Sequence, residues 1–165
     1  MKSLFNSCRI RLSFVALLAG AASAHAAEPL RIGVPVGLSG ANSVVAPVVD
    51  HFMQDRKAKT FFLVGSDYAF GRGMLKFTRE YIEKQGGRVV GEEYLPIDGS
   101  DWTPVVSKIR SANPDALISS TAGGGPNVSL AKQVKAAGLA MPYGNLAIDE
   151  GTAKTMGDTA VGLYM

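Results

Sequence analysis

The chain has 165 residues, of which 47% are hydrophobic, so it is long enough to bury one core, short for two domains, and too apolar to be disordered. Its formal net charge of +3 would favour an anionic partner such as nucleic acid. That interpretation fails because three of the cations lie in the first eleven residues, ahead of an apolar run.

Residues 1–26 have the pattern of a secretory signal peptide. The early cations precede an uncharged apolar run over residues 12–22, and Ala24-His25-Ala26 is a small-x-small cleavage site. The run is shorter than the about 20 apolar residues of a membrane-spanning helix. Cleavage after Ala26 removes three cations, no acidic residue and the only cysteine, Cys8. The remaining chain is neutral, and it can form no disulfide and offers no basic surface for nucleic acid.

The next segment predicts a strand, a turn and a helix. Residues 30–36 form a short apolar run, and Gly37-Leu38-Ser39-Gly40 predicts a turn after it. From Asn42 to Asp55, apolar side chains recur at helical spacing, which predicts a helix capped by one of its first two residues. Pro47 lies inside this segment, so a helix that begins near Ala46 with proline in its first turn is the alternative.

The rest of the chain alternates apolar strands with helical stripes. Strands are predicted at residues 60–65, 88–95, 116–120, 141–146 and 161–165. The helices between them are predicted as a stripe from Met74 to a stop at Gly86-Gly87, a helix capped by Thr103 with Pro104 in its first turn, a stripe from Leu130 to Gly138, and a short helix over 149–156. This alternation indicates βαβ units, and therefore an α/β fold with a parallel sheet and helices on both faces.

Ligands of such sheets bind at the carboxyl ends of the strands. The loop over residues 66–73 carries two aromatic side chains, Tyr68 and Phe70, and precedes a helix whose first N–H groups are free. Two interpretations remain open: aromatics that cover an apolar or amide-bearing ligand, or an ordinary turn with locally packed aromatics. The predicted carboxyl-end loops are Ser66–Phe70, Pro96–Asp101, Thr121–Pro126 and Asn145–Glu150.

The sequence contains no recognisable catalytic, metal or cofactor motif. Gly71-Arg72-Gly73 lacks the third glycine of a dinucleotide-binding loop and the Gly-Lys-Ser/Thr of a phosphate loop. His51 has no second histidine or cysteine near it, and Glu92 and Glu93 are neighbours on a strand, so they point to opposite faces. We therefore expect a protein that is not an enzyme and binds neither metal nor cofactor.

Six segments occur in a characteristic order along the chain. They are Phe61–Tyr68 with Gly71-Arg72-Gly73, Gly86–Tyr94, Asp101–Ile109, Asn113–Leu117, Lys135–Leu139 and Met156–Tyr164. In this order they resemble the second lobe of type I periplasmic solute-binding proteins of ABC importers, namely the Leu/Ile/Val-binding and amide- or urea-binding receptors. The likeness covers residues 42–165 and the first strand at 30–40.

The resemblance implies a receptor whose two lobes close on a small polar ligand, such as an amino acid, an amide or urea, and then dock on an ABC permease in the inner membrane. It implies a periplasmic location, no nucleic-acid partner and no cofactor. It also implies ligand contacts: an aromatic from Tyr68 or Phe70, the glycine loop at Gly124, and a polar or acidic contact from the segment that holds Asn145 and Asp149.

The sequence departs from the family in its domain organisation. Residues 1–26 are the expected signal peptide, 27–41 the first strand of lobe one, and 42–165 mostly lobe two. The resemblance therefore implies that the middle of lobe one is deleted and that the C-terminal part is truncated. A receptor component that is a partial chain is the leading hypothesis. The alternatives are a non-functional gene fragment and an extracytoplasmic ligand-sensing domain. An exported enzyme of the same fold would need a nucleophile–base set, which the sequence does not contain.

The first testable prediction concerns export. Because the cleavage site ends at Ala26, N-terminal sequencing of the exported protein should begin at Ala27. Exported protein that still begins at Met1 would contradict the signal-peptide interpretation.

Overall fold

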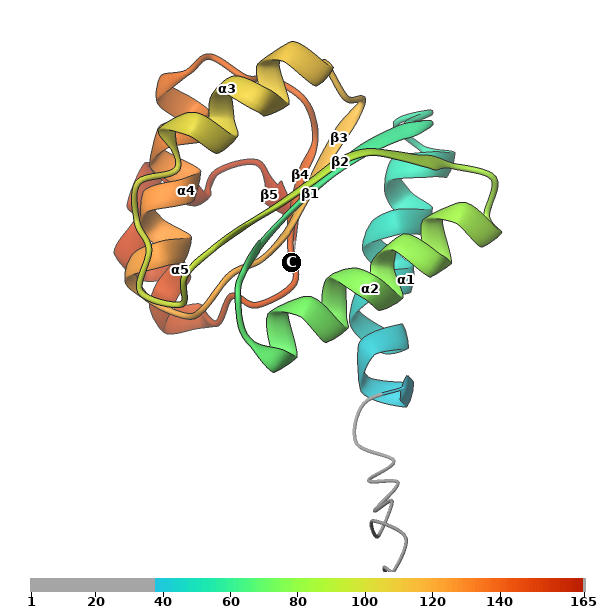
Figure 1. The fold of residues 1–165 in the computed structure, drawn as a ribbon, viewed down its shortest axis with the longest axis horizontal. Coiled ribbons are helices and arrows are strands. Elements are labelled where there is room, and N and C mark those ends of the chain that lie inside the picture. The colour runs from blue at the N-terminus through green and yellow to red at the C-terminus, as the bar shows by residue number, and fades with distance from the viewer. Residues whose placement is uncertain (1–37, 165) are drawn as a thin grey trace, which may run out of the picture. The chain divides into compact units, whose positions relative to one another are not determined.

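A parallel sheet of five strands organises residues 38–164, the part of the chain that the computed structural model describes (Figure 1). The sheet order is β2-β1-β3-β4-β5, and every neighbouring pair is parallel. The predicted signal peptide and the predicted strand at 30–36 lie outside the described residues. The strands are β1 (Thr60–Ser66), β2 (Arg88–Leu95), β3 (Ala116–Ser120), β4 (Tyr143–Asn145) and β5 (Leu163–Tyr164).

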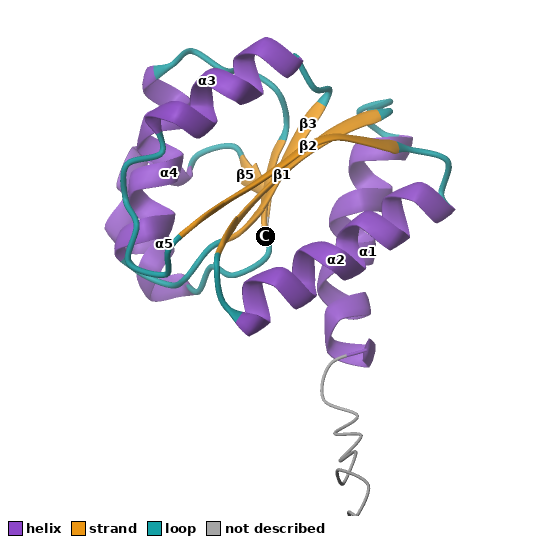
Figure 2. Cartoon of the chain, in the orientation of Figure 1, coloured by secondary structure: helices purple, strands orange, loops and turns teal. Residues whose placement is uncertain are grey.

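Helices cover both faces of this sheet, as Figures 1 and 2 show. α1 (Leu38–Gln54) and α2 (Ala69–Lys84) pack on one face. α3 (Thr103–Ala112), α4 (Gly125–Ala136) and α5 (Glu150–Met156) pack on the other, followed by a 3-10 turn over Gly157–Ala160. The predicted α/β fold is therefore confirmed.

β1 shows why the apolar runs form the centre of the sheet. Its side chains are buried from Phe61 onward, and they alternate between the two cores. Phe61 and Leu63 face α1 and α2, whereas Phe62 and Val64 face α3 and α4. A strand covered on both faces needs apolar residues at every position, which is the continuous run that the sequence carries. β4 and β5 are shorter than predicted, with three and two residues.

The predictions for the start of α1 are wrong. The turn expected at residues 37–40 and a helix start at Asn42 or Ala46 are replaced by a helix that begins at Leu38 and contains Pro47. Proline inside a helix costs about 3 kcal/mol. Burying one valine or phenylalanine stabilises by about 1.5–3 kcal/mol, and α1 buries four such side chains against the sheet, so packing outweighs the proline. These are Val45, Val48, Val49 and Phe52.

The loop predicted over residues 66–73 is also too long, because α2 already begins at Ala69. Gly71 lies in the first turn, where the helix passes close to the strand ends. A Cβ atom at Gly71 would lie 2.5 Å from the carbonyl oxygen of Ser66 and 3.1 Å from that of Ser120. The glycine therefore serves a close approach of helix to strands and is not part of a flexible loop.

Trp102 joins α3 to α4. Thr103 was predicted as the cap of α3, but it is the first residue of the helix, and Trp102 is the N-cap. The Asp101 carboxylate accepts a hydrogen bond from the Thr103 N–H (3.1 Å). The indole is fully buried and donates from Nε1 to the carbonyl of Pro126 (3.2 Å), while the Trp102 backbone N–H donates to Gln133 Oε1 (2.8 Å). These bonds fix the loop after β2 against α4.

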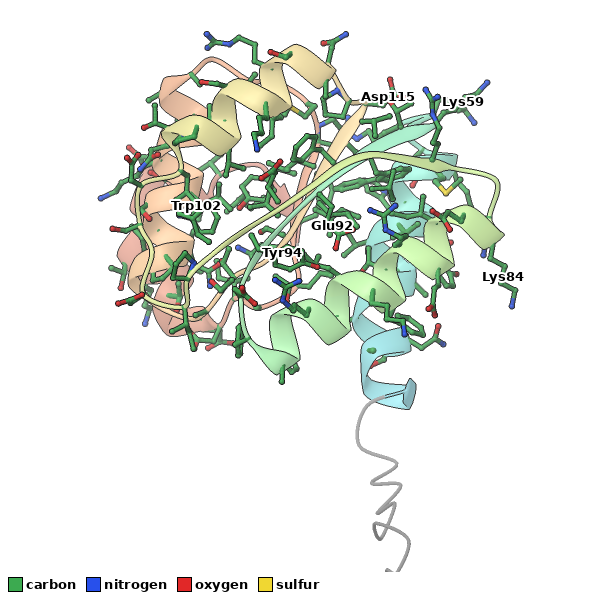
Figure 3. All side chains as sticks on the ribbon, in the orientation of Figure 1. Lys59, Lys84, Glu92, Tyr94, Trp102 and Asp115 are labelled. Atoms are coloured by element: carbon green, nitrogen blue, oxygen red, sulfur yellow. The ribbon has the colours of Figure 1, made fainter. Side chains whose placement is uncertain are left out.

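Asp115 connects the amino ends of β1 and β3 through hydrogen bonds. Its Oδ2 accepts hydrogen bonds from the backbone N–H of Lys59 (2.9 Å), and from the backbone N–H (2.8 Å) and hydroxyl (2.9 Å) of Thr60. In return, the Asp115 N–H donates to the Thr60 carbonyl (3.0 Å). The two backbone N–H groups and the hydroxyl stabilise the carboxylate, so the pKa of Asp115 is lowered from its usual value. Figure 3 shows Asp115 beside Lys59 at this end of the sheet.

We predict that Asp115→Ala lowers the free energy of unfolding by about 1–2 kcal/mol at pH 7, because it leaves two strand N–H groups without their acceptor. The folded-state pKa is lower than the unfolded one, so this contribution is present above pH about 4 and is lost as the pH falls through the folded-state pKa. Urea unfolding at pH 7 and pH 3 measures both effects. Asp98→Ala, which removes an exposed carboxylate, is the control; equal midpoints for the two variants would contradict the role of Asp115.

Candidate functional site

The strand order places a topological switch point between the carboxyl ends of β1 and β3. The chain leaves β1 toward α2 on one face and leaves β3 toward α4 on the opposite face, so the two connections diverge. In open parallel sheets, ligands bind at such a switch point, outside the carboxyl ends of the strands. Here the Ser66 hydroxyl accepts a bond from the Ala122 N–H (2.9 Å), which fixes the loop of one strand to the loop of the other.

The two predicted aromatics lie together on the β1 side of the switch point. Tyr68 is the N-cap residue of α2, and its ring centroid is 6.1 Å from that of Phe70. Phe70 is 53% exposed, whereas Tyr68 is half-buried, and its burial raises the pKa of its hydroxyl. The pair thus presents an apolar ring to solvent at the edge where a ligand of this fold would bind.

The glycine loop lies on the β3 side. Gly124 has a φ of +72°, a conformation that a side chain disfavours, and no atom lies within 4 Å of where its Cβ would be. It is the N-cap of α4, and no side chain caps this helix or α2. Both helices therefore present uncapped backbone N–H groups at the carboxyl edge.

A buried amide network supports the loop after β4. Asn145, 2% exposed, donates from Nδ2 to Asn127 Oδ1 (2.8 Å), and its Oδ1 accepts from the Ala147 N–H (3.0 Å). Asn127 donates from Nδ2 to the Ala147 carbonyl (2.9 Å), and its Oδ1 also accepts from the Thr121 hydroxyl. The predicted ligand contact Asn145 thus has its amide engaged inside the protein. Asn127, which opens an Asn-Val-Ser glycosylation pattern, is fully buried and inaccessible to a sugar.

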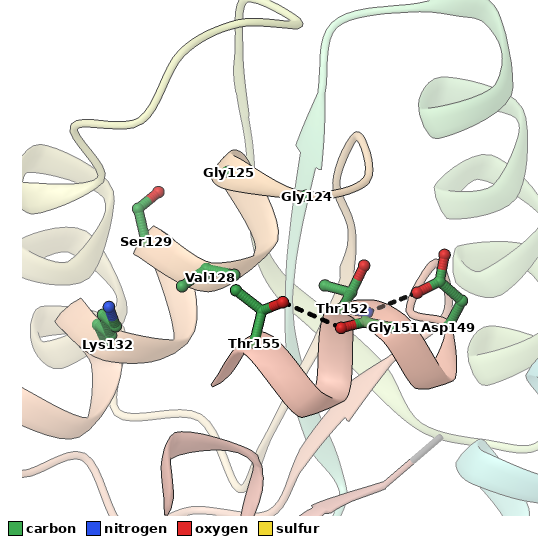
Figure 4. A pocket seen from close by; sticks show the side chains of 9 residues that line it. All are labelled: Gly124, Gly125, Val128, Ser129, Lys132, Asp149, Gly151, Thr152 and Thr155. Atoms are coloured by element: carbon green, nitrogen blue, oxygen red, sulfur yellow. Dashed lines mark hydrogen bonds between the residues drawn. The ribbon is translucent and has the colours of Figure 1, made fainter. Parts of the chain in front are cut away.

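Gly124 and Asp149 line the same pocket, of about 490 Å³, between α4 and α5 (Figure 4). Asp149 is the N-cap of α5 and accepts a bond from the Thr152 N–H (2.6 Å), which lowers the pKa of its carboxyl. Tyr68, Phe70 and Asn145 do not line this pocket. Its other lining residues are Gly125, Val128, Ser129, Lys132, Gly151, Thr152 and Thr155.

Residues 38–164 contain neither a cluster of metal-ligating side chains nor a helix that could span a membrane. No three histidine, cysteine or acidic side chains in this part of the chain are grouped so that they could hold a metal ion. None of its helices combines the length and apolar character needed to cross a membrane.

Comparisons with known proteins give a family match. The model of a family described as periplasmic binding protein matches residues 29–165. No curated protein sequence matches the chain significantly.

Solved structures share the fold of the chain. An ABC transporter substrate-binding protein from Sphaerobacter thermophilus is 25% identical, with a TM-score of 0.65, over 70% of this chain and 33% of its own. A solute-binding protein from Rhodopseudomonas palustris BisB5, in complex with 3,4-dihydroxybenzoic acid, is 26% identical, with a TM-score of 0.62, over 73% and 34%. A branched-chain amino acid ABC transporter ligand-binding protein from Burkholderia xenovorans LB400 is 24% identical, with a TM-score of 0.63, over 70% and 31%. The chain therefore matches about a third of the length of these proteins.

We predict that Asn145→Ala destabilises the protein by about 2–4 kcal/mol, because it removes a donor to Asn127 and leaves the N–H of Ala147 without its acceptor. Asp149→Ala, which removes an exposed helix cap, should cost about 1 kcal/mol. Urea unfolding followed by the fluorescence of the single tryptophan, Trp102, measures both. An Asn145→Ala cost no larger than that of Asp149→Ala would contradict a structural role of the amide network.

Proposed function

The chain belongs to the periplasmic binding protein family, and on that premise we propose that it is the ligand-contacting second lobe of an extracytoplasmic solute receptor that serves an ABC importer. The observation that carries the proposal is the switch point between β1 and β3. There an aromatic pair, the half-buried Tyr68 and the exposed Phe70, lies on one side and the glycine loop around Gly124 lies on the other.

Ligand binding at this edge requires no catalytic residue. Phe70 would cover an apolar part of the ligand, and the uncapped N–H groups at the starts of α2 and α4 would donate to its polar part. A second lobe would supply the remaining contacts, and the ligand would stabilise the closed pair of lobes. The hydroxyl of Ser66 accepts the Ala122 N–H and the amide of Asn145 accepts the Ala147 N–H, so both side chains hold loops at this edge.

The ligand we propose is an amino acid, or else an amide or urea. The relative from Burkholderia xenovorans is described as a branched-chain amino acid receptor, which supports this assignment. Aromatic carboxylic acids are a second candidate, because the Rhodopseudomonas palustris relative holds 3,4-dihydroxybenzoic acid. Apolar amino acids and aromatic carboxylic acids each combine an apolar group, suited to the ring of Phe70, with a carboxylate, suited to backbone N–H donors, whereas an amide or urea would offer its carbonyl oxygen to the same donors.

The proposal includes export to the periplasm by the N-terminal signal peptide and docking on an ABC permease. In this arrangement residues 42–165 are mostly lobe two, and most of lobe one is not encoded between residues 27 and 41. Reading frames next to the gene distinguish a receptor component from a non-functional fragment: permease and ATPase frames support the receptor, and a separate frame for lobe one identifies its partner.

We predict that the 165-residue chain alone binds leucine, acetamide, urea or benzoate more weakly than millimolar, which corresponds to about 4 kcal/mol. The reason is that burying a charged or polar ligand group without matched partners from lobe one costs several kcal/mol. A chimera with a complete lobe one between residues 41 and 42 should bind one member of the panel measurably more tightly. Phe70→Ala should then weaken binding, as measured by calorimetry.

Val161→Ala is the matched control, since it removes an exposed apolar side chain just before β5, at the opposite edge of the sheet. Submillimolar binding by the chain alone would contradict the missing-lobe part of the proposal. A folded chimera that binds none of the four ligands would contradict the assignment of ligand class, and equal effects of Phe70→Ala and Val161→Ala would contradict the position of the site.

A further inference from the structure

One cation lies directly beside the aromatic pair. Arg72, in the first turn of α2, donates from Nε to Asp67 Oδ1 (2.5 Å), and its guanidinium lies 4.3 Å from the ring centroid of Tyr94. Asp67 begins the segment Asp67–Phe70, which we call the aromatic loop; its last two residues form the start of α2. Backbone bonds also hold this segment, from the Asp67 N–H to the Leu95 carbonyl (2.6 Å) and from the Tyr68 N–H to the Ser66 carbonyl (3.0 Å). No side chain caps α2, so Arg72 supplies a side-chain restraint where the helix start has none.

The ring beneath Arg72 is itself held in place. The hydroxyl of Tyr94 donates to the Glu92 carboxylate, and Arg79 donates to the same carboxylate from Nε (2.9 Å). Arg79 also lies 3.5 Å from a Glu83 oxygen. This network connects β2 to the middle of α2, and Figure 3 shows Glu92 and Tyr94 between the two elements. Arg72 therefore connects the exposed start of α2 to a tyrosine ring that is itself held on β2.

From these contacts we propose that Arg72 is a positioning residue that holds Tyr68 and Phe70 in their ligand-facing arrangement; the ligand-related part rests on the proposed function. The side chains of Arg72 and Asp67 are 53% and 51% exposed, so their ion pair contributes little to global stability. Its effect is local: it restricts the conformations of a loop whose aromatic ring is exposed. A loop held in place binds more tightly, because less of the protein is in a non-binding conformation.

The rival role for Arg72 is direct contact with a ligand carboxylate. The two roles differ in what Asp67 does. If Arg72 acts through Asp67, then Asp67→Asn should loosen the loop and weaken binding as Arg72→Ala does. If Arg72 binds the ligand itself, Asp67→Asn releases the guanidinium and should not weaken binding.

The first experiment needs no ligand. Backbone 15N relaxation of the full chain should give order parameters near about 0.85 at Ala69 and Phe70, falling toward about 0.6 in Arg72→Ala and in Asp67→Asn. Arg72→Lys keeps the charge and loses the planar stacking on Tyr94, so it should give an intermediate value. Amides of β1 should not change, nor should Ala69 and Phe70 in Arg110→Ala, a control that removes an exposed arginine bonded to the Ala137 carbonyl. Unchanged order parameters in Arg72→Ala or Asp67→Asn would overturn the proposal.

The second experiment uses the lobe-one chimera with leucine and benzoate. A binding-competent fraction reduced to about one fifth would raise Kd about fivefold in Arg72→Ala and in Asp67→Asn. The melting temperatures of these two variants should differ little from that of Arg110→Ala. A purely structural role of Arg72 would not explain weaker binding without a loss of stability. A weakened Arg72→Ala with an unweakened Asp67→Asn would overturn positioning in favour of direct contact. If neither leucine nor benzoate binds, the relaxation experiment still decides whether Arg72 positions the loop, and the proposed ligand class is tested separately by the full panel of four ligands.

Discussion

β1 lies between β2 and β3, and both pairings are parallel, so Ser66, Leu95 and Ser120 end their strands at the same edge of the sheet. At the opposite edge, Asp115 bonds the backbone at the start of β1 and fixes its position relative to β3. Every feature that could contact a ligand depends on this alignment. A one-residue shift of β1 would move its loop relative to the glycine loop and exchange the side chains that face the two cores.

The starts of α2 and α4 determine which groups are exposed at the carboxyl ends of the aligned strands. α2 starts so close to the ends of β1 and β3 that only glycine fits at position 71, and this start places Tyr68 and Phe70 at the switch point. On the other side, the positive φ of Gly124 turns the chain into α4. Buried amides of Asn127 and Asn145 then support the loop that leads to Asp149. The surface is thus held mainly by backbone geometry and buried polar bonds, and the exposed groups remain free for a ligand.

The sequence predicts the sheet well because β1, β2 and β3 carry apolar runs bounded by turns, a signal that is local in the chain. It predicts the helix starts poorly. Sequence rules look for a capping side chain, but α2 begins at an uncapped Tyr68, and its start depends on contact between Gly71 and the strand ends. The engagement of the Asn145 amide could not be predicted either, because its partner Asn127 lies 18 residues away on a helix and only the fold brings them together. The loops at the carboxyl ends of the strands were predictable from the alternation of strands and helices, but the strand order that places the switch point, and the pocket between α4 and α5, were not.

We propose that the surface at the carboxyl ends of β1 and β3 is half of a ligand-binding cleft. The most direct test is chemical-shift mapping on the 15N-labelled chain at high concentrations of leucine and of benzoate, which detects binding too weak for calorimetry. The account predicts shifts confined to amides that follow the strands, around Tyr68, Phe70 and Gly124. Shifts centred on Lys132 in the pocket between α4 and α5, or at the amino ends of the strands near Asp115, would contradict it.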